Sequence, residues 1–530
     1  MAEKEKKYDR QLRLWGDHGQ RDLENASVCL INVTATGTET LKNLILPGIG
    51  SFTIVDGGRI SGQDAGNNFF LDPEKIGEYK SKVAMELLQE LNPDVKGEYV
   101  EEDVSQLLER TPQFFTGFSV VISGSLTLTV LKKLAALLWP HKVPLVVCLS
   151  YGFLGYIRIA VEEHAVIESH PDNAHEDLRL DDPIEDFVKF CDSIDLESLD
   201  KKDHSHTPYL IILFKYLQTW KNDHNGQVPN TWKEKKQFKA AILAGVRKNA
   251  EGVPEDEENY DEAAKHVNTA FVPNKIPPEL KAILDDHKCL NITDSSSNFW
   301  ILANGLRQFV QNEGCGFLPL RGSLPDMTSD SERYVKLQNI YQAKAAHDMQ
   351  IVSNYVSQAC SSLGCGNGRV SERDLKRFCR NAHFLRVLRT RSLEEEYKQP
   401  SKAVIDEFTS DSNSDALWYV LWRAVEMFYT THGKYPGIED EELEMDVSRM
   451  KSFVKDLMKS WGIPGAIEAV SDDSLQEICR CGAAEIHSVA AYMGGVAAQE
   501  CIKLITGQYV PVSGAYIYNG LKSTSLTLAV

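Results

Sequence analysis

An apolar run, a short polar loop and a helix pattern follow one another near the start of the chain, as in many nucleotide-binding turns. The apolar run covers 28–33 and the helix pattern begins near Thr38. A loop of this kind holds phosphate through backbone N–H groups, which requires glycine for close approach. Here one glycine, Gly37, is retained, and other residues stand at the remaining loop positions: Asn32, Thr34 and Ala35. The spacing therefore predicts a nucleotide-binding frame with a degenerate phosphate cradle.

Asp56 ends the next predicted strand, 19 residues after Gly37. In dinucleotide-binding folds a carboxylate at this point holds a ribose hydroxyl, so a nucleotide-dependent oxidoreductase remains an alternative. Threonine and alanine at the glycine positions argue against it. The segment Thr36-Gly37-Thr38-Glu39 matches a capping box, so we predict that Thr36 caps the helix and that the loop is structural.

Composition limits the classes of protein to which the chain can belong. Its 530 residues are enough for two to four domains. A net charge of −19 argues against general nucleic-acid binding. The charged N-terminus lacks the apolar region of a secretory signal, and no apolar run has the length of a membrane span. Eleven cysteines without disulfide-like spacing are typical of a reducing compartment, so we expect a cytoplasmic or nuclear protein.

The distribution of predicted elements indicates an α/β fold with an interruption. Residues 1–169 alternate between strands and helices, which predicts a Rossmann-like, mostly parallel sheet. Amphipathic helices dominate 170–480, including one from Ser331 towards Gly364 and another that starts at Ser371. Residues 481–530 return to α/β character, with a helix of small residues expected at 485–505. We therefore predict one discontinuous α/β domain, formed by 1–169 and 481–530, with a large, mainly helical insertion. The strands are expected at 27–33, 51–56, 118–123, 143–150, 156–161, 515–519 and 525–530.

Cysteines offer two further kinds of chemistry. A zinc site would need two pairs of ligands at suitable spacing. No second pair accompanies Cys360 and Cys365, with Cys379 beyond, and only one residue separates Cys479 from Cys481, which is too close. No metal site is therefore expected. A nucleophilic cysteine is harder to exclude, but no candidate lies in a motif for it and buried structural cysteines are common. The candidates are Cys191, Cys289, Cys315 and Cys360.

Both ends of the chain resemble the ubiquitin-like-protein activating enzymes. The resemblance rests on YDRQLRLWG at 8–16, GTETLKNL at 37–44 and AYMGGVAAQE at 491–500. It implies a ThiF/MoeB-type adenylation fold, into which a helical catalytic-cysteine region is inserted. The active half of such an enzyme adenylates the C-terminal glycine of the modifier with Mg-ATP and then transfers the modifier to a cysteine.

Several positions depart from the pattern of the active half. Besides the degenerate loop, Asn67 stands where an active half has arginine, and Leu126 falls near the position of the metal-binding aspartate. Lys80 is retained. The resemblance thus implies a regulatory, non-catalytic half-enzyme that binds no cofactor itself and whose half-domain lacks the nucleophile. Mg-ATP would be bound by a catalytic partner subunit.

Arg10 is the exception to these losses. In related dimeric enzymes an arginine from this N-terminal motif reaches the ATP in the partner's site, and a guanidinium suits phosphate because its charge is permanent. Alternatively, Arg10 belongs to an exposed ion-pair cluster with Asp9 and Arg13.

The segment 326–338 is the expected contact with the catalytic subunit. By resemblance its interface residues are Asp326, Tyr334, Leu337 and Gln338; the alternative is that this amphipathic stripe belongs to the core. Further expected partners are the ubiquitin-like modifier and, indirectly, the conjugating enzyme. The long insertion favours the neddylation branch of the family over sumoylation, although the corresponding subunit for another modifier and a pure interaction scaffold both remain open.

Overall fold

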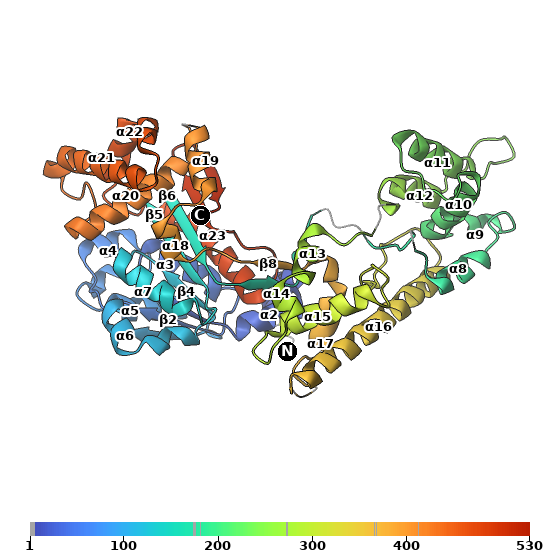
Figure 1. Ribbon diagram of the computed structural model, residues 1–530, viewed down its shortest axis with the longest axis horizontal. Helices are drawn as coiled ribbons and strands as arrows, with labels where there is room; N and C mark the ends of the chain where they lie inside the picture. The colour runs from blue at the N-terminus through green and yellow to red at the C-terminus, as the bar shows by residue number, and fades with distance from the viewer. Residues whose placement is uncertain are drawn as a thin grey trace. The chain divides into compact units, whose positions relative to one another are not determined.

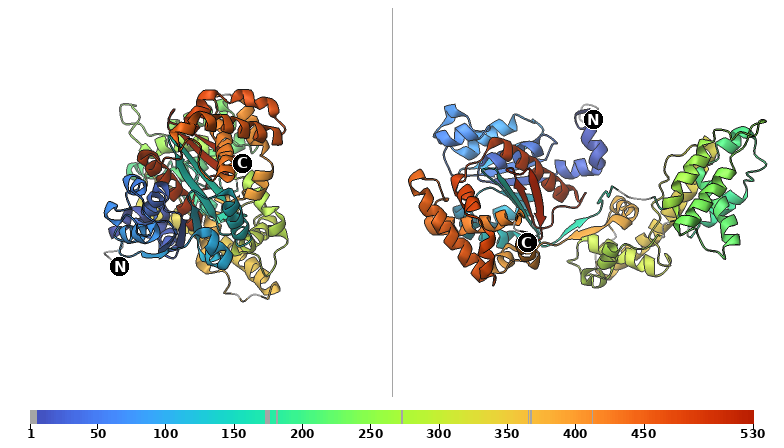
Figure 2. Two further views of the ribbon diagram at one scale, coloured as in Figure 1. Left: turned by 90° about the vertical axis from the view of Figure 1, so that its left-hand side faces the viewer. Right: turned by 90° about the horizontal axis from the view of Figure 1, so that it is seen from above.

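The computed structural model divides the chain into two compact units (Figures 1 and 2). It describes residues 6–172, 176–180, 182–271, 274–364, 366, 368–411 and 413–530. Unit 1 consists of Met1–Val166 and Val387–Val530, and unit 2 is Ile167–Arg386. Both ends of the chain thus belong to one unit, which a long internal segment interrupts.

Unit 1 is built on an eight-stranded mixed sheet in the order β10-β9-β6-β5-β4-β1-β2-β3. The five strands from β3 to β5 are mutually parallel, as predicted, whereas β6, β9 and β10 extend the sheet with antiparallel pairs. The carboxyl ends of β1, β4 and β5 consequently lie at one edge, where ligands of open α/β sheets bind. The strands are β1 (Ser27–Ile31), β2 (Ser51–Val55), β3 (Lys96–Val100), β4 (Val120–Ser123), β5 (Leu145–Tyr151), β6 (Leu154–Ala160), β9 (Ala515–Asn519) and β10 (Thr524–Leu528).

Alternate residues of β1 enter two different cores because successive side chains of a strand point to opposite faces. Val28 and Leu30 pack with helices α3 (Ala35–Ile45) and α23 (His487–Thr506) on one face of the sheet. Cys29 and Ile31 belong to a second core on the other face, which α7 and α20–α22 cover. The helices of the first segment are α2 (Asp9–Glu24, kinked at Gly16), α3 (Ala35–Ile45), α4 (Gly62–Asn67), α5 (Lys80–Gln89), α6 (Val104–Arg110) and α7 (Leu128–Leu138).

The helical region does not form one insertion from 170 to 480. Residues 387–480 pack with unit 1, so our second boundary, at 480, is wrong, and the chain returns to unit 1 at Val387. The boundary was misplaced because α20 buries its apolar face against the sheet of unit 1. A local pattern shows that this face is apolar but does not show which neighbour covers it. The helices of this return segment are α18 (Leu393–Lys398), α19 (Lys402–Ser410), α20 (Ala416–His432), α21 (Leu443–Ser460), α22 (Asp472–Arg480) and α23 (His487–Thr506).

Unit 2 is helical, as its amphipathic pattern predicts. The long helix α16 runs to Ser362, and α17 begins after Ser371, whose hydroxyl accepts the backbone N–H of Asp374, so both of these predictions are confirmed. The helices are α8 (Glu185–Asp192), α9 (Lys201–Ser205), α10 (Tyr209–Asp223), α11 (Trp232–Ala244), α12 (Glu258–Ala270), α13 (Pro278–Leu284), α14 (His287–Leu290), α15 (Asn298–Gln311), α16 (Ser331–Ser362) and α17 (Glu372–Arg380). A short ribbon of β7 (His164–Val166) and β8 (Arg386–Leu388) lies where the chain leaves unit 1 and returns.

Two further features complete the fold. Strand β3 has no apolar run in its KGEYV sequence, and the sequence pattern did not reveal it, because an exposed edge strand needs few apolar side chains. Among the described residues, no helix combines the length and the apolar character needed to cross a membrane.

Candidate functional site

The N-terminus of α3 lies at the carboxyl edge of the sheet, directly after β1. Its cap is Thr34, whose hydroxyl accepts the backbone N–H of Gly37 at 3.0 Å. Our prediction that Thr36 caps this helix is therefore wrong by two residues. The helix starts earlier than expected, so Thr36 lies inside its first turn and Glu39 pairs with Lys42 instead of closing a capping box.

The side chain of Glu485 occupies the anion-binding position of this helix. Its carboxylate accepts the backbone N–H groups of Ala35 (2.6 Å) and Thr36 (3.0 Å). It also accepts the hydroxyls of Thr36 (2.6 Å) and Ser150 (3.2 Å), and Ser150 lies in β5. Backbone N–H groups at a helix N-terminus are those that bind phosphate in nucleotide sites. In this protein they bind a carboxylate of the chain itself.

The retained glycine has a packing role. A Cβ atom at Gly37 would lie 2.9 Å from Leu30 Cδ1, so glycine lets α3 pack close to β1 without displacing Leu30. Thr34 lies close to the loop after β4, where a Cβ on Gly124 would come within 2.8 Å of its methyl group. Asn32 has a φ of 65° and donates its amide to the Ser125 carbonyl at 2.6 Å. Side chains thus hold this loop to its neighbour where glycines would leave room for phosphate.

Asp56 is buried, and both of its carboxylate oxygens have backbone partners. One accepts the N–H of Val33 at 2.8 Å and the other the N–H of Gly58 at 2.7 Å. The carboxylate therefore stabilises the ends of two neighbouring strands. The contacts of Asp56 are structural, and they lend the oxidoreductase alternative no support.

Lys80 lies at the start of α5 and forms an ion pair with Asp64 at 2.7 Å. Burial raises the pKa of Asp64, but hydrogen bonds from Lys80 and Ser61 outweigh it and hold that pKa below its usual value. Asn67 ends α4 and is half-buried. The retained lysine is thus engaged with a neighbouring carboxylate.

Leu126 lies between β4 and α7, near the position at which the resemblance places a metal-binding aspartate in an active half. It lines a small, largely apolar cavity with Trp422 and Tyr435. An apolar side chain in such surroundings has no metal-binding chemistry. Together with the carboxylate of Glu485 on the helix N-terminus, this means that the residues present do not fit Mg-ATP.

Arg10 lies on the first turn of α2 and is exposed. Within the described residues it forms no ion pair, whereas Arg13 pairs with Asp9 at 2.9 Å. The ion-pair cluster that we considered as an alternative therefore includes Arg13 but not Arg10.

The four predicted interface residues differ in exposure. Leu337 is completely buried in the core of unit 2, so its prediction as an interface residue is wrong. It occupies the inward face of α16, and the amphipathic stripe that we noted is partly core. Asp326 is exposed, and Tyr334 and Gln338 are half-buried, so their contact with a partner stays a prediction.

The candidate nucleophilic cysteines lie mostly in the core. Cys191, Cys289 and Cys360 are buried, and burial raises the pKa of Cys289 to about 12. Cys315 is exposed, and Cys365 lies outside the described residues. A buried thiol with a raised pKa is not the thiolate that nucleophilic chemistry needs. Within the parts of the chain that the structure describes, no three His, Cys, Asp or Glu side chains are grouped so that they could hold a metal.

Glu485 is the site residue that sequence reasoning missed. The sequence pattern placed it inside the helix 485–505, whereas α23 begins at His487 and Glu485 precedes it. Its contact with Ala35 spans 450 positions of the chain, and no local pattern signals a pairing at that separation.

Known proteins match this chain along nearly its whole length. The ThiF family model matches residues 8–529. The NEDD8-activating enzyme E1 regulatory subunits of Xenopus laevis and Gallus gallus are each 50% identical over 526 residues, which is 99% of this chain and 98% of theirs. The Arabidopsis thaliana subunit AXR1 is 40% identical over 531 residues, covering 100% of this chain and 97% of its own length.

Solved structures align less extensively. E. coli tRNA N6-threonylcarbamoyladenosine dehydratase in complex with AMP is 19% identical over 29% of this chain and 64% of its own, with a TM-score of 0.25. The whole-length relatives and the family model carry the conclusion: the chain belongs to the ThiF family and, within it, to the NEDD8-activating enzyme E1 regulatory subunits.

Proposed function

We propose that this chain is the non-catalytic half of a heterodimeric activating enzyme for a ubiquitin-like modifier in neddylation. A catalytic partner subunit binds Mg-ATP, adenylates the C-terminal glycine of the modifier and forms the cysteine thioester. This chain binds no nucleotide or metal and completes the paired adenylation fold. The observation that carries the proposal is the carboxylate of Glu485 on the N-terminus of α3.

The physical argument is one of charge. A triphosphate would have to place its negative oxygens where the Glu485 carboxylate already accepts two backbone N–H groups and two hydroxyls. Two like unit charges 4 Å apart repel by about 4 kcal/mol near a protein surface. Leu126 supplies no metal ligand to offset this repulsion, and Lys80 is paired with Asp64. Nucleotide binding is therefore disfavoured at all three positions, Glu485, Leu126 and Lys80.

Arg10 supplies the remaining catalytic contribution in this proposal. Its guanidinium is exposed on α2 and has no ion-pair partner within the described residues, so it is available to the phosphates of ATP in the partner's site. A pure interaction scaffold would make no use of such a residue. The effect of Arg10 on the reaction thus separates a scaffold from a subunit that completes the active site.

The remaining partners follow from the same proposal. The segment 326–338, through Asp326, Tyr334 and Gln338, contacts the catalytic subunit, and the assembled enzyme presents the modifier to a conjugating enzyme. We place this activity in the cytoplasm or nucleus, which imaging of a fluorescently tagged chain tests.

The deciding experiment is ATP–pyrophosphate exchange in the presence of the modifier. The purified chain should show no exchange and no bound nucleotide, and exchange should appear when the catalytic subunit is added. Exchange by the chain alone would overturn the proposal. Absence of exchange from the mixture, with the two proteins shown to co-elute and the modifier present, would also count against it.

A further inference from the structure

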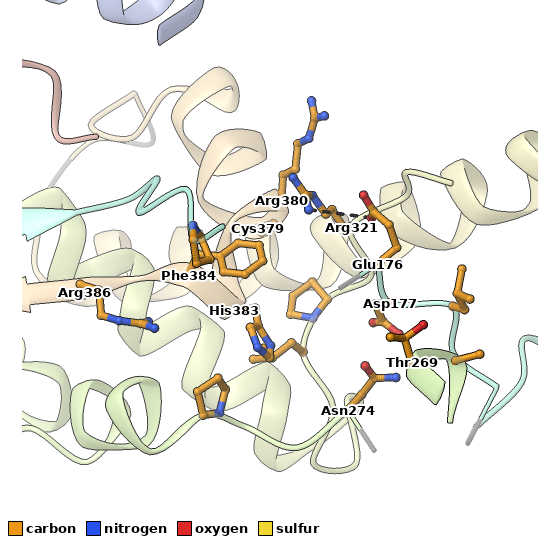
Figure 3. A pocket seen from close by; sticks show the side chains of 16 residues that line it. Glu176, Asp177, Thr269, Asn274, Arg321, Cys379, Arg380, His383, Phe384 and Arg386 are labelled. Atoms are coloured by element: carbon orange, nitrogen blue, oxygen red, sulfur yellow. Dashed lines mark ion pairs between the residues drawn. The ribbon is translucent and has the colours of Figure 1, made fainter. Parts of the chain in front are cut away.

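Two neighbouring hollows in unit 2 are lined by basic side chains. The first has a volume of about 260 Å³ and is lined in part by Arg321, Arg380 and Arg386 (Figure 3). The second has a volume of about 560 Å³ and adds Lys376. Arg321, Cys379 and Arg380 line both hollows, so the two lie side by side. We call this feature the basic groove.

The acidic residues of the groove are already neutralised. Glu176 lies 3.8 Å from Arg321 and accepts the hydroxyl of Ser323 at 3.0 Å; Figure 3 marks the ion pair with a dashed line. Asp177 is held by Arg179 at 2.8 Å. These pairs leave the remaining cations of the groove without a matching carboxylate.

Three cations of the groove are unmatched. Within the described residues Lys376, Arg380 and Arg386 form no ion pair, and Arg386 donates one hydrogen bond to the Leu385 carbonyl at 2.8 Å. The Nε atom of Arg321 is buried and has no hydrogen-bond partner among the described residues. Partial burial and the neighbouring Arg386 lower the pKa of His383, so that its ring is neutral near pH 7. The groove therefore carries net positive charge in a chain whose net charge is −19.

Shape indicates the kind of anion that would fit. Cations line two adjacent hollows, and apolar side chains such as Leu178, Leu318 and Phe384 line the first of them. A small anion needs only one cluster of donors, whereas an extended chain with several acidic side chains uses separated cations and an apolar floor. Arginine clusters recognise acidic and phosphorylated peptide motifs through bidentate hydrogen bonds.

We propose that the basic groove of unit 2 binds an extended, anionic peptide segment of a protein partner through its three unmatched cations, Lys376, Arg380 and Arg386. The anionic groups are carboxylates or phosphoryl groups, which share this recognition chemistry. The site lies wholly in unit 2, so its existence does not depend on the nucleotide chemistry proposed above.

The test measures fluorescence polarisation of labelled short peptides with the full-length chain. A glutamate-rich peptide, its glutamine counterpart and a phosphoserine counterpart are the probes. The charged peptides should bind, more weakly as salt is raised, and the glutamine peptide should not. Whichever charged peptide binds more tightly identifies the source of the anion. Equal binding of the glutamate and glutamine peptides, or no binding of either charged peptide, would overturn the proposal, as would tighter binding of a single-stranded DNA of similar charge.

Variants locate the site. Arg380→Gln and Arg386→Gln should each raise the Kd by about tenfold, the size expected for the loss of a charged hydrogen bond. Lys233→Gln, which removes an exposed cation from α11 in the same unit, is the matched control and should leave the Kd unchanged. Unchanged melting temperatures show that each variant folds. Unaltered Kd values in both arginine variants would refute the assignment.

Discussion

The carboxylate of Glu485 accepts both the backbone N–H and the hydroxyl of Thr36, at 3.0 and 2.6 Å, although 449 positions separate the two residues. This contact joins the return segment of the chain to α3, the helix that follows β1. It also supplies a negative charge at the N-terminus of α3, where a nucleotide-binding relative of this fold would place a phosphate.

Removing this carboxylate should destabilise unit 1. In Glu485→Ala the N–H groups of Ala35 and Thr36 lose their acceptor, at a cost of about 1–3 kcal/mol. Inorganic phosphate should raise the melting temperature of this variant part of the way back to the wild-type value, because the anion binds the vacated helix N-terminus. The melting temperature of the wild type should not change. Thermal melts in phosphate and in chloride at equal ionic strength measure this difference.

Glu485→Gln is the matched control, because its amide oxygen still accepts hydrogen bonds and its charge is lost. Its melting temperature should lie between those of the wild type and the alanine variant, and phosphate should raise it only slightly. A Glu485→Ala variant that melts like the wild type would show that the carboxylate is not needed at this position.

Arg10→Ala should lower ATP–pyrophosphate exchange by the heterodimer by at least about tenfold, since one charge-stabilising donor is lost. The heterodimer should remain assembled on size-exclusion chromatography. Arg13→Ala is the control, because Arg13 lies on the same helix and is paired with Asp9. Equal exchange rates for the two variants would remove the proposed role of Arg10.

Leu337→Ala should reduce the stability of unit 2 by about 2–5 kcal/mol, because it leaves a cavity in a fully packed core. Chemical denaturation of the isolated chain detects this loss without any partner. A variant with wild-type stability would contradict the burial of this side chain.

Tyr334→Ala tests whether Tyr334 contributes to partner binding or to the stability of the core. Tyr334 is half-buried on α16, so its truncation should weaken co-purification with the catalytic subunit more than it changes the melting temperature. Asn339→Ala, an exposed change on the same helix, should affect neither. Full retention of partner affinity in Tyr334→Ala would exclude this part of the proposed interface.

His164 should make the free energy of unfolding decrease as the pH falls into the mildly acidic range. Burial lowers its pKa to about 4, and its Nε2 atom is buried without a hydrogen-bond partner among the described residues. The unfolded chain binds a proton near pH 6.5, so the unfolded state holds more protons between about pH 6.5 and 4. Stability is therefore lost as the pH falls through this window, by at most about 3 kcal/mol.

Denaturation curves between pH 7 and 4 measure this loss, and His164→Gln should reduce its slope because glutamine does not titrate. Identical slopes for the variant and the wild type would show that other groups dominate this range.

Local pattern was sufficient for much of the architecture. The apolar run before Asn32, the helix that follows it and the long helix after Asp330 were all predicted, because their periodicity reflects which face each element buries. The missing glycines also followed from residue types alone, since only glycine permits close approach of phosphate to the backbone. Strand β3 was not predicted, because it is an exposed edge strand with little apolar signal.

The sequence by itself determined the α/β frame, the degenerate loop and the resemblance at both ends of the chain, all of which depend on residues close together in sequence. Tertiary structure alone decided that Glu485 fills the anion position, that Leu337 belongs to the core and that residues 387–480 pack with unit 1. Each of these outcomes depends on which distant surfaces meet when apolar faces are buried, and local periodicity shows that a face is apolar without identifying what covers it.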